Sequence, residues 1–85
     1  MKYIVTEDEL GVQEIFTFPS RINHDAMMLN LEGIRNQMCG QWQRVFREPV
    51  SAGFIGSNGQ CYGGSETLGL LSRPEEDTAL WRTQT

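Results

Sequence analysis

Cysteine, histidine and positive charge are scarce in this chain, and each shortage argues against a class of protein. Two cysteines and one histidine are too few for the usual four-ligand zinc site, so neither a metal nor another cofactor is expected. Seven basic residues stand against eleven acidic ones, which gives a net charge of −4. This negative charge disfavours direct nucleic-acid binding, because contacts with phosphate supply most of its non-specific affinity.

Long apolar runs are also missing. No stretch approaches the roughly 18 apolar residues of a membrane span. The acidic residues Glu7, Asp8 and Glu9 stand where a signal peptide would continue its apolar segment. We therefore expect a cytoplasmic protein that has no membrane partner and keeps the thiols of Cys39 and Cys61 reduced.

The length of 85 residues leaves room for one domain, which we expect over residues 1–85 with a flexible end. A domain of this size buries only about 60% of the surface of its unfolded chain, so its stability margin is small. Association with further copies would add stability. A homo-oligomer is therefore expected.

The first half of the chain predicts a hairpin followed by a helix. Residues 2–6 and 12–18 are rich in β-branched and aromatic side chains and should pair as strands, with apolar side chains on both faces of the second. Asn23 can cap a helix over residues 23–39, in which apolar residues recur every three or four positions up to Gly40.

The second half predicts more strands and a short helix. Residues 42–47 and 50–55 should be extended on either side of an interruption at Pro49, and the turn at Asn58 and Gly59 should lead into 60–62 as a second hairpin. Residues 65–71 can form another short strand. A helix through Trp81 should begin with Ser72 as its cap and Glu75 reaching back. These elements predict an α+β fold, with a small antiparallel sheet of two hairpins, one main α-helix packed on a face and a short C-terminal helix.

Two groups of residues are candidates for ligand binding. Arg21, Asn23 and His24 lie at the predicted helix N-terminus, where N–H groups attract anions. Alternatively, His24 is only a solvated residue of the first turn. The second group lies beside two glycines and comprises Tyr62, Ser65, Glu66 and Thr67. Its aromatic ring can stack on a ring of a ligand, and its hydroxyls and carboxylate can form hydrogen bonds with the edges of that ring. Alternatively, this glycine-rich segment contains only hairpin turns, and it is not a P-loop.

Catalysis has little support in the sequence. No nucleophile motif surrounds Cys39 or Cys61, and both are expected to be small buried side chains. Trp81 fits either a core position or an interface position. The chain is therefore predicted not to be an enzyme.

Three segments carry a resemblance. The stretches FPSRINHD at 18–25, REPVSAGF at 47–54 and CYGGSETLGL at 61–70 resemble a group of short bacteriophage- and prophage-encoded proteins of unknown activity. The resemblance implies a compact phage accessory protein that acts in the host bacterial cytoplasm. Such proteins commonly bind either a host defence enzyme or its small nucleotide messenger.

Two functions follow as hypotheses. The first is a phage-type accessory protein that sequesters a small, anionic, nucleotide-like ligand as a counter-defence. In this hypothesis the anionic group of the ligand binds Arg21, Asn23 and His24, and its ring binds Tyr62, Ser65, Glu66 and Thr67. The alternative is an inhibitor whose acidic surface occupies the basic groove of a host nucleic-acid-handling defence enzyme. That surface would comprise Glu7, Asp8, Glu9, Glu75, Glu76 and Asp77.

Overall fold

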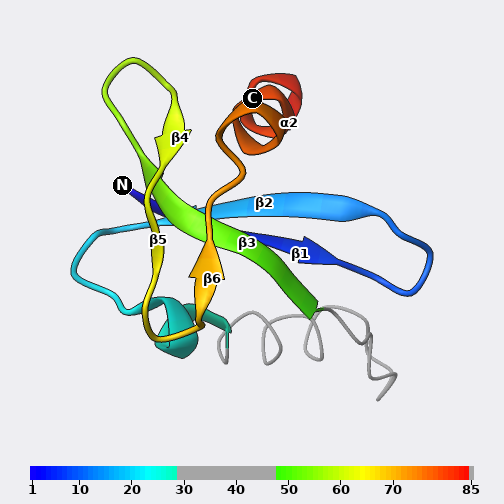
Figure 1. Ribbon diagram of the computed structural model, residues 1–85, viewed down its shortest axis with the longest axis horizontal. Coiled ribbons are helices and arrows are strands. Elements are labelled where there is room, and N and C mark those ends of the chain that lie inside the picture. The colour runs from blue at the N-terminus through cyan, green and yellow to red at the C-terminus, as the bar shows by residue number, and fades with distance from the viewer. Residues whose placement is uncertain (29–47, 85) are drawn as a thin grey trace.

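The structure, a computed structural model, describes residues 1–28 and 48–84. Within these residues the chain forms an α+β fold with a four-stranded antiparallel sheet in the order β2-β1-β3-β4, a two-stranded sheet of β5 and β6, and a C-terminal helix, α2 (Figure 1). The predicted α+β class is confirmed. The predicted strand over 42–47, most of the helix over 23–39 and Cys39 lie outside the described residues.

The first two strands pair as their composition predicts. β1 (Lys2–Glu7) runs antiparallel to β2 (Gln13–Phe18), and the two extend together across the molecule (Figure 1). Asp8 organises the connection, because its Oδ1 accepts the N–H groups of Leu10 and Val12, each at 2.9 Å. An aspartate that bonds nearby backbone N–H groups is a common way to fix a turn.

The third strand differs from the prediction at Pro49. β3 (Glu48–Ile55) is continuous, and Pro49 lies within it, opposite Thr6 of β1. Val5 instead faces Ser51, so the register shifts between Val5 and Thr6. The expected interruption at Pro49 was wrong, because a bulge accepts a residue that lacks an N–H donor.

Two short hairpins follow β3. β4 (Cys61–Tyr62) pairs with the end of β3 after a turn in which Gly59 has a φ of 78°. β5 (Gly64–Ser65) and β6 (Leu70–Leu71) pair with each other across residues 66–69. The single strand predicted over 65–71 is thus two strands and a turn, because Gly69 adopts a φ of 66° and reverses the chain.

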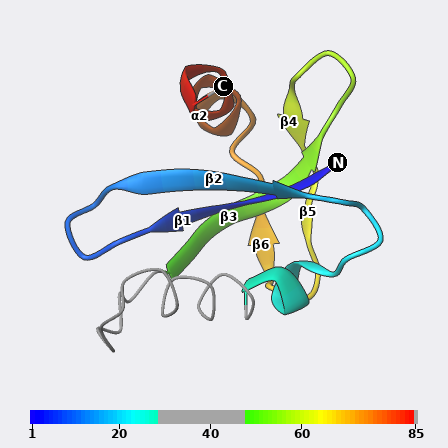
Figure 2. The same cartoon turned by 180° about the vertical axis from the view of Figure 1, so that it is seen from behind.

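The central sheet is covered on both faces, and β1 contributes alternate residues to each. One cluster of side chains lies between the sheet and α2 and contains Tyr3, Val5, Ile55 and Cys61, with Ile15, Val50, Leu80 and Trp81 against them. The other lies on the opposite face and contains Ile4, Phe18, Met28 and Ala52. Figure 2 shows α2 and the short helical segment at 24–28 on opposite sides of the strands. Cys61 is buried as predicted, and Trp81 packs on the core.

α2 (Pro74–Gln84) begins one residue later and ends three residues later than predicted. Its first turn is closed by Asp77 rather than Glu75, because the Asp77 carboxylate accepts the Arg73 N–H at 2.9 Å. Pro74 is the first helical residue, where its missing N–H has no cost. No helix within the described ranges is both long and apolar enough to cross a membrane.

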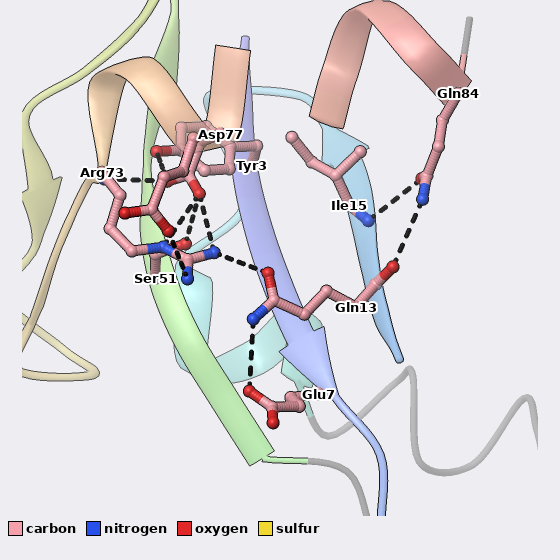
Figure 3. A network of polar contacts seen from close by, with 9 residues as sticks. Tyr3, Glu7, Gln13, Ile15, Ser51, Arg73, Asp77 and Gln84 are labelled. Carbon is pink, nitrogen blue, oxygen red and sulfur yellow. Dashed lines mark hydrogen bonds and ion pairs between the residues drawn. The ribbon is translucent and has the colours of Figure 1, made fainter. Parts of the chain in front are cut away.

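A buried polar cluster joins this helix to the sheet. Asp77 is fully buried and accepts hydrogen bonds from the Tyr3 hydroxyl at 2.6 Å and the Ser51 hydroxyl at 3.0 Å. The Arg73 guanidinium donates to the same carboxylate from Nε at 3.1 Å and Nη2 at 2.9 Å (Figure 3). Asp77 therefore cannot belong to the acidic surface on which the sequence placed it.

Candidate functional site

A cavity of about 270 Å³ brings together most of the residues that the sequence singled out. It lies on the face of the sheet opposite α2, between the helical start at residue 24 and the turn after β5. Five predicted residues line it, namely Asn23, His24, Ser65, Glu66 and Thr67. Lys2, Phe54 and Gly64 complete the lining.

Lys2 supplies the positive charge of this cavity. It stands opposite Phe54 in the pairing of β1 with β3, so the strands hold the two side chains side by side. The Lys2 ammonium group donates to the Ile22 carbonyl at 3.0 Å, which anchors it near the helical start. An ammonium group has three donors, so this anchor leaves N–H groups for a ligand.

His24 is a buried residue that lines the cavity, and not the solvated residue of the alternative interpretation. Its side chain is buried, and Nε2–H donates to the Gly53 carbonyl at 3.1 Å. Burial, aided by the positive charge of Lys2, holds the pKa of His24 below its usual 6.5, although the Gly53 carbonyl and Asp25 act in the opposite direction. The ring is therefore mainly neutral at pH 7, so His24 adds no positive charge to the cavity.

Aromatic rings form a row behind the cavity. His24 contacts Phe18 and Phe54 edge to face, with ring centroids 5.3 Å and 5.9 Å apart. Phe54 in turn stacks on Tyr62 with centroids 5.7 Å apart and an angle of 28° between the planes. Such pairs stabilise one another by about 1 kcal/mol beyond simple burial, so Phe54 is held in a fixed orientation at the cavity.

The turn after β5 presents polar groups at the opposite side. Ser65 is buried, and its hydroxyl accepts the Leu68 N–H at 3.2 Å and lies 3.2 Å from the Thr67 hydroxyl. These bonds fix the turn, while Glu66 and Thr67 remain exposed at the rim of the cavity. Gly64 permits this close approach, because a Cβ there would lie 2.8 Å from the Leu70 carbonyl oxygen.

Two predicted residues lie elsewhere. Arg21 is exposed and does not line the cavity. Tyr62 is 53% exposed and contributes only indirectly, through its stack on Phe54. Lys2, rather than Arg21, is therefore the basic residue that lines this cavity.

The sequence missed Lys2, Phe54 and Gly64. Phe54 belongs to a recognisable strand, but nothing local indicates that its partner would be Lys2, 52 positions earlier. Gly64 is one of the two glycines noted beside the predicted group, although it was not counted as a site residue; paired glycines often mark close backbone approach.

Other features of the described residues offer less chemistry. A larger hollow of about 360 Å³ lies between β4 and α2, and it includes Arg82 and Glu75 but no aromatic side chain. Burial raises the pKa of the Cys61 thiol, which makes it a poor nucleophile. No group of three or more potential metal ligands occurs in the part of the chain that the structure describes.

Comparison with known proteins leaves the cavity to be interpreted from its own residues. The chain matches no protein-family model, no curated protein and no solved structure.

Proposed function

We propose that this chain is a non-enzymatic binding protein whose cavity takes a small anionic ligand bearing an aromatic ring, of which a nucleotide is the best example. One observation carries the proposal: the Lys2 ammonium group, the Phe54 ring and the polar turn at 65–67 line the same cavity. Binding sites for small molecules typically combine apolar walls with a few convergent polar groups.

The anionic part of the ligand binds at Lys2. A hydrogen bond to a charged group contributes about 1.5 to 3 kcal/mol. Asn23 lies at the same end of the cavity, at the start of the helical segment, and adds a side-chain amide donor. The neutral His24 ring bounds this end without adding charge.

The ring of the ligand binds against Phe54. Tyr62 and His24 fix the orientation of Phe54, so little freedom is lost when a base stacks there. The Glu66 carboxylate can accept from the exocyclic amine of a base, and the Thr67 hydroxyl can bond a sugar or ring edge. This arrangement gives each part of a nucleotide a matching group.

The size of the cavity favours more than one copy of the chain. Its volume of about 270 Å³ lies just below the usual range of roughly 300 to 1,000 Å³ for small-molecule sites. A nucleotide would therefore be only partly enclosed by one chain. A homo-oligomer, in which a second copy closes the cavity, completes the site.

The resemblance to short phage-encoded proteins supplies a setting. A phage accessory protein in the host bacterial cytoplasm that binds a nucleotide messenger removes it from the defence enzyme that uses it. The proposed role is thus sequestration without chemical change of the ligand.

Native mass spectrometry and calorimetry test the proposal. Protein purified gently from a bacterial host should carry a reproducible added mass of a nucleotide, and titration with AMP, ADP and cyclic dinucleotides should show which of these binds. Lys2→Gln and Phe54→Ala should each weaken binding of the identified nucleotide about tenfold or more. Arg21→Gln is the matched control, because it removes the same charge outside the cavity.

An unliganded protein that binds none of these nucleotides would refute the proposal. Equal effects of Lys2→Gln and Arg21→Gln would also refute it, since they would indicate a general effect of net charge rather than a contact in the cavity.

The acidic inhibitor is the second candidate, and one observation favours it. Four carboxylates line a shared hollow of about 250 Å³ where β1 and its turn meet the start of β3, from Glu7, Asp8, Glu9 and Glu48. Binding of a basic groove by this surface should weaken steeply as salt rises, since exposed charges are screened within about 10 Å at 0.1 M. Ligand binding in the partly enclosed cavity should change less over the same range of salt.

A further inference from the structure

β2 is an edge strand, and its sequence favours pairing of that edge with another strand. Among the described strands β2 pairs only with β1, so one side of its backbone faces away from the sheet. Its sequence, QEIFTF, combines high strand propensity with a single charge and no proline. Six-residue segments of this kind are prone to pair with copies of themselves when their edge is free.

The side chain of Gln84 occupies the middle of this edge. The Ile15 N–H donates to Gln84 Oε1 at 3.2 Å, and Gln84 Nε2 donates to the Gln13 carbonyl at 3.4 Å. Figure 3 shows the amide of Gln84, at the end of α2, facing the backbone of β2. One side-chain amide thus satisfies an outward donor and an outward acceptor two residues apart, as a residue of a neighbouring strand would do.

The other end of the helix is tied to the same strand. The Arg73 guanidinium donates to Gln13 Oε1 at 3.0 Å and to the buried Asp77 carboxylate at 2.9 Å. The inner face of α2 also packs Leu80 and Trp81 against the core. Gln84 is therefore held at the edge by the packing of the whole helix.

We propose that Gln84 is a guard residue that prevents β2 from pairing with β2 of a second copy of this chain. This inference is independent of the proposed ligand. In an antiparallel pair centred on Ile15, each Ile15 N–H would donate to the Ile15 carbonyl of the other copy, and Gln13 would face Thr17. Such a two-fold contact is self-complementary, and its central donor is the N–H that Gln84 occupies.

Removal of the amide tests the proposal directly. Gln84→Ala should sediment with at least twice the mass of the wild type at high protein concentration, because each two-fold contact joins two wild-type particles. Thr83→Ala is the matched control, because Thr83 is also exposed and bonds only the Leu80 carbonyl of its own helix among the described contacts. In dilute Gln84→Ala, the Ile15 N–H should exchange with deuterium about fivefold faster, for a net hydrogen bond of about 1 kcal/mol.

A second substitution identifies the edge. The Thr17 N–H points away from β1, as the Ile15 N–H does, since outward groups recur every second residue. Thr17→Pro removes that donor without touching the ladder to β1, so Gln84→Ala combined with Thr17→Pro should return to the wild-type mass. In associated Gln84→Ala, the Thr17 N–H should gain protection from exchange, which tests the edge even if the proline variant is unstable.

An unchanged mass for Gln84→Ala would overturn the proposal. So would association that leaves the exchange of the Thr17 N–H unchanged, because the contact would then lie elsewhere on the molecule.

Discussion

The substitution Asp77→Ala should remove a large part of the stability of this fold. Asp77 is fully buried, and its carboxylate accepts from the Tyr3 and Ser51 hydroxyls and from the backbone and side chain of Arg73. Alanine would leave both hydroxyls inside the protein without this acceptor. It would also leave the Arg73 guanidinium, 27% exposed, without its buried partner.

The size of this loss of stability follows from the polar groups that Asp77→Ala leaves without a hydrogen-bond partner. Each buried hydroxyl left unpaired costs about 1 to 3 kcal/mol, and removal of one member of a buried ion pair costs about 3 to 5 kcal/mol. The two hydroxyls together cost at least about 2 kcal/mol. Because Arg73 can turn partly to water, its lost ion pair adds only about 1 kcal/mol, so we expect a total of about 3 kcal/mol. A chain of this length has a free energy of unfolding of roughly 4 to 13 kcal/mol, so the loss is severe.

Urea unfolding followed by circular dichroism measures this loss. The control is Glu76→Gln, which breaks an exposed ion pair with the same Arg73 at 3.2 Å and should change stability by less than about 1 kcal/mol. Tyr3→Phe alone should cost about 1 to 2 kcal/mol. Combined with Asp77→Ala it should cost less than the sum, because the hydroxyl that would be stranded is absent.

Two results would refute this reasoning. One is a stability of Asp77→Ala within about 0.5 kcal/mol of the wild type, the range of ordinary surface substitutions. The other is strict additivity with Tyr3→Phe, which would show that the two groups do not act through their hydrogen bond.

Two further predictions concern His24, which lines the cavity, and Gly53, whose carbonyl bonds it. Burial lowers the pKa of His24 from 6.5, so the folded state prefers the neutral ring. The contribution of His24 to the stability of the fold is therefore complete above about pH 6.5 and declines as the pH falls below that value. Urea midpoints of the wild type and His24→Gln should therefore converge between about pH 7.5 and pH 5, and parallel curves would contradict this. Gly53→Ala should destabilise the fold by about 1 to 3 kcal/mol, because its Cβ would lie 2.3 Å from the Tyr62 carbonyl oxygen. In Gly56→Ala the new Cβ instead meets the Asn58 side chain at 3.1 Å, so equal melting temperatures for the two variants would count against this steric argument.

The elements that sequence reasoning found are those that local patterns determine. β1 and β2 were recognisable because β-branched and aromatic residues flank an acidic turn that ends at Gly11. The start of α2 was also recognisable, because Pro74 suits the first position of a helix. Pro49 was misjudged because a bulge depends on the register of two distant strands, which the local sequence does not contain.

The helix α2 shows why charge is a poor guide to exposure. Glu75, Glu76 and Asp77 are consecutive acidic residues, yet the turn of the helix directs only Asp77 inward, where it lies on the same side as Leu80, Trp81 and Gln84. Helical spacing of three and four residues would have separated Asp77 from its neighbours. Its partners Tyr3 and Ser51 come from other parts of the chain and could not have been inferred.

The candidate site was predicted in its local parts and missed in its distant ones. Ser65, Glu66 and Thr67 were found because they follow one another in a single turn. Lys2 and Phe54 were not found, because they meet only through the pairing of β1 with β3. Arg21 was chosen because arginine suits anions, but its exposed position lies outside the cavity.

The alternation of β1 links the stability of the fold to the cavity. Lys2 and Ile4 face the cavity side of the sheet, while Tyr3 and Val5 face α2. A shift of β1 by one residue would exchange these faces, so that Lys2 would enter the core and Tyr3 would lose Asp77. The bond of Tyr3 to Asp77 therefore holds Lys2 opposite Phe54, and the buried cluster on one face of the sheet fixes the geometry of the cavity on the other.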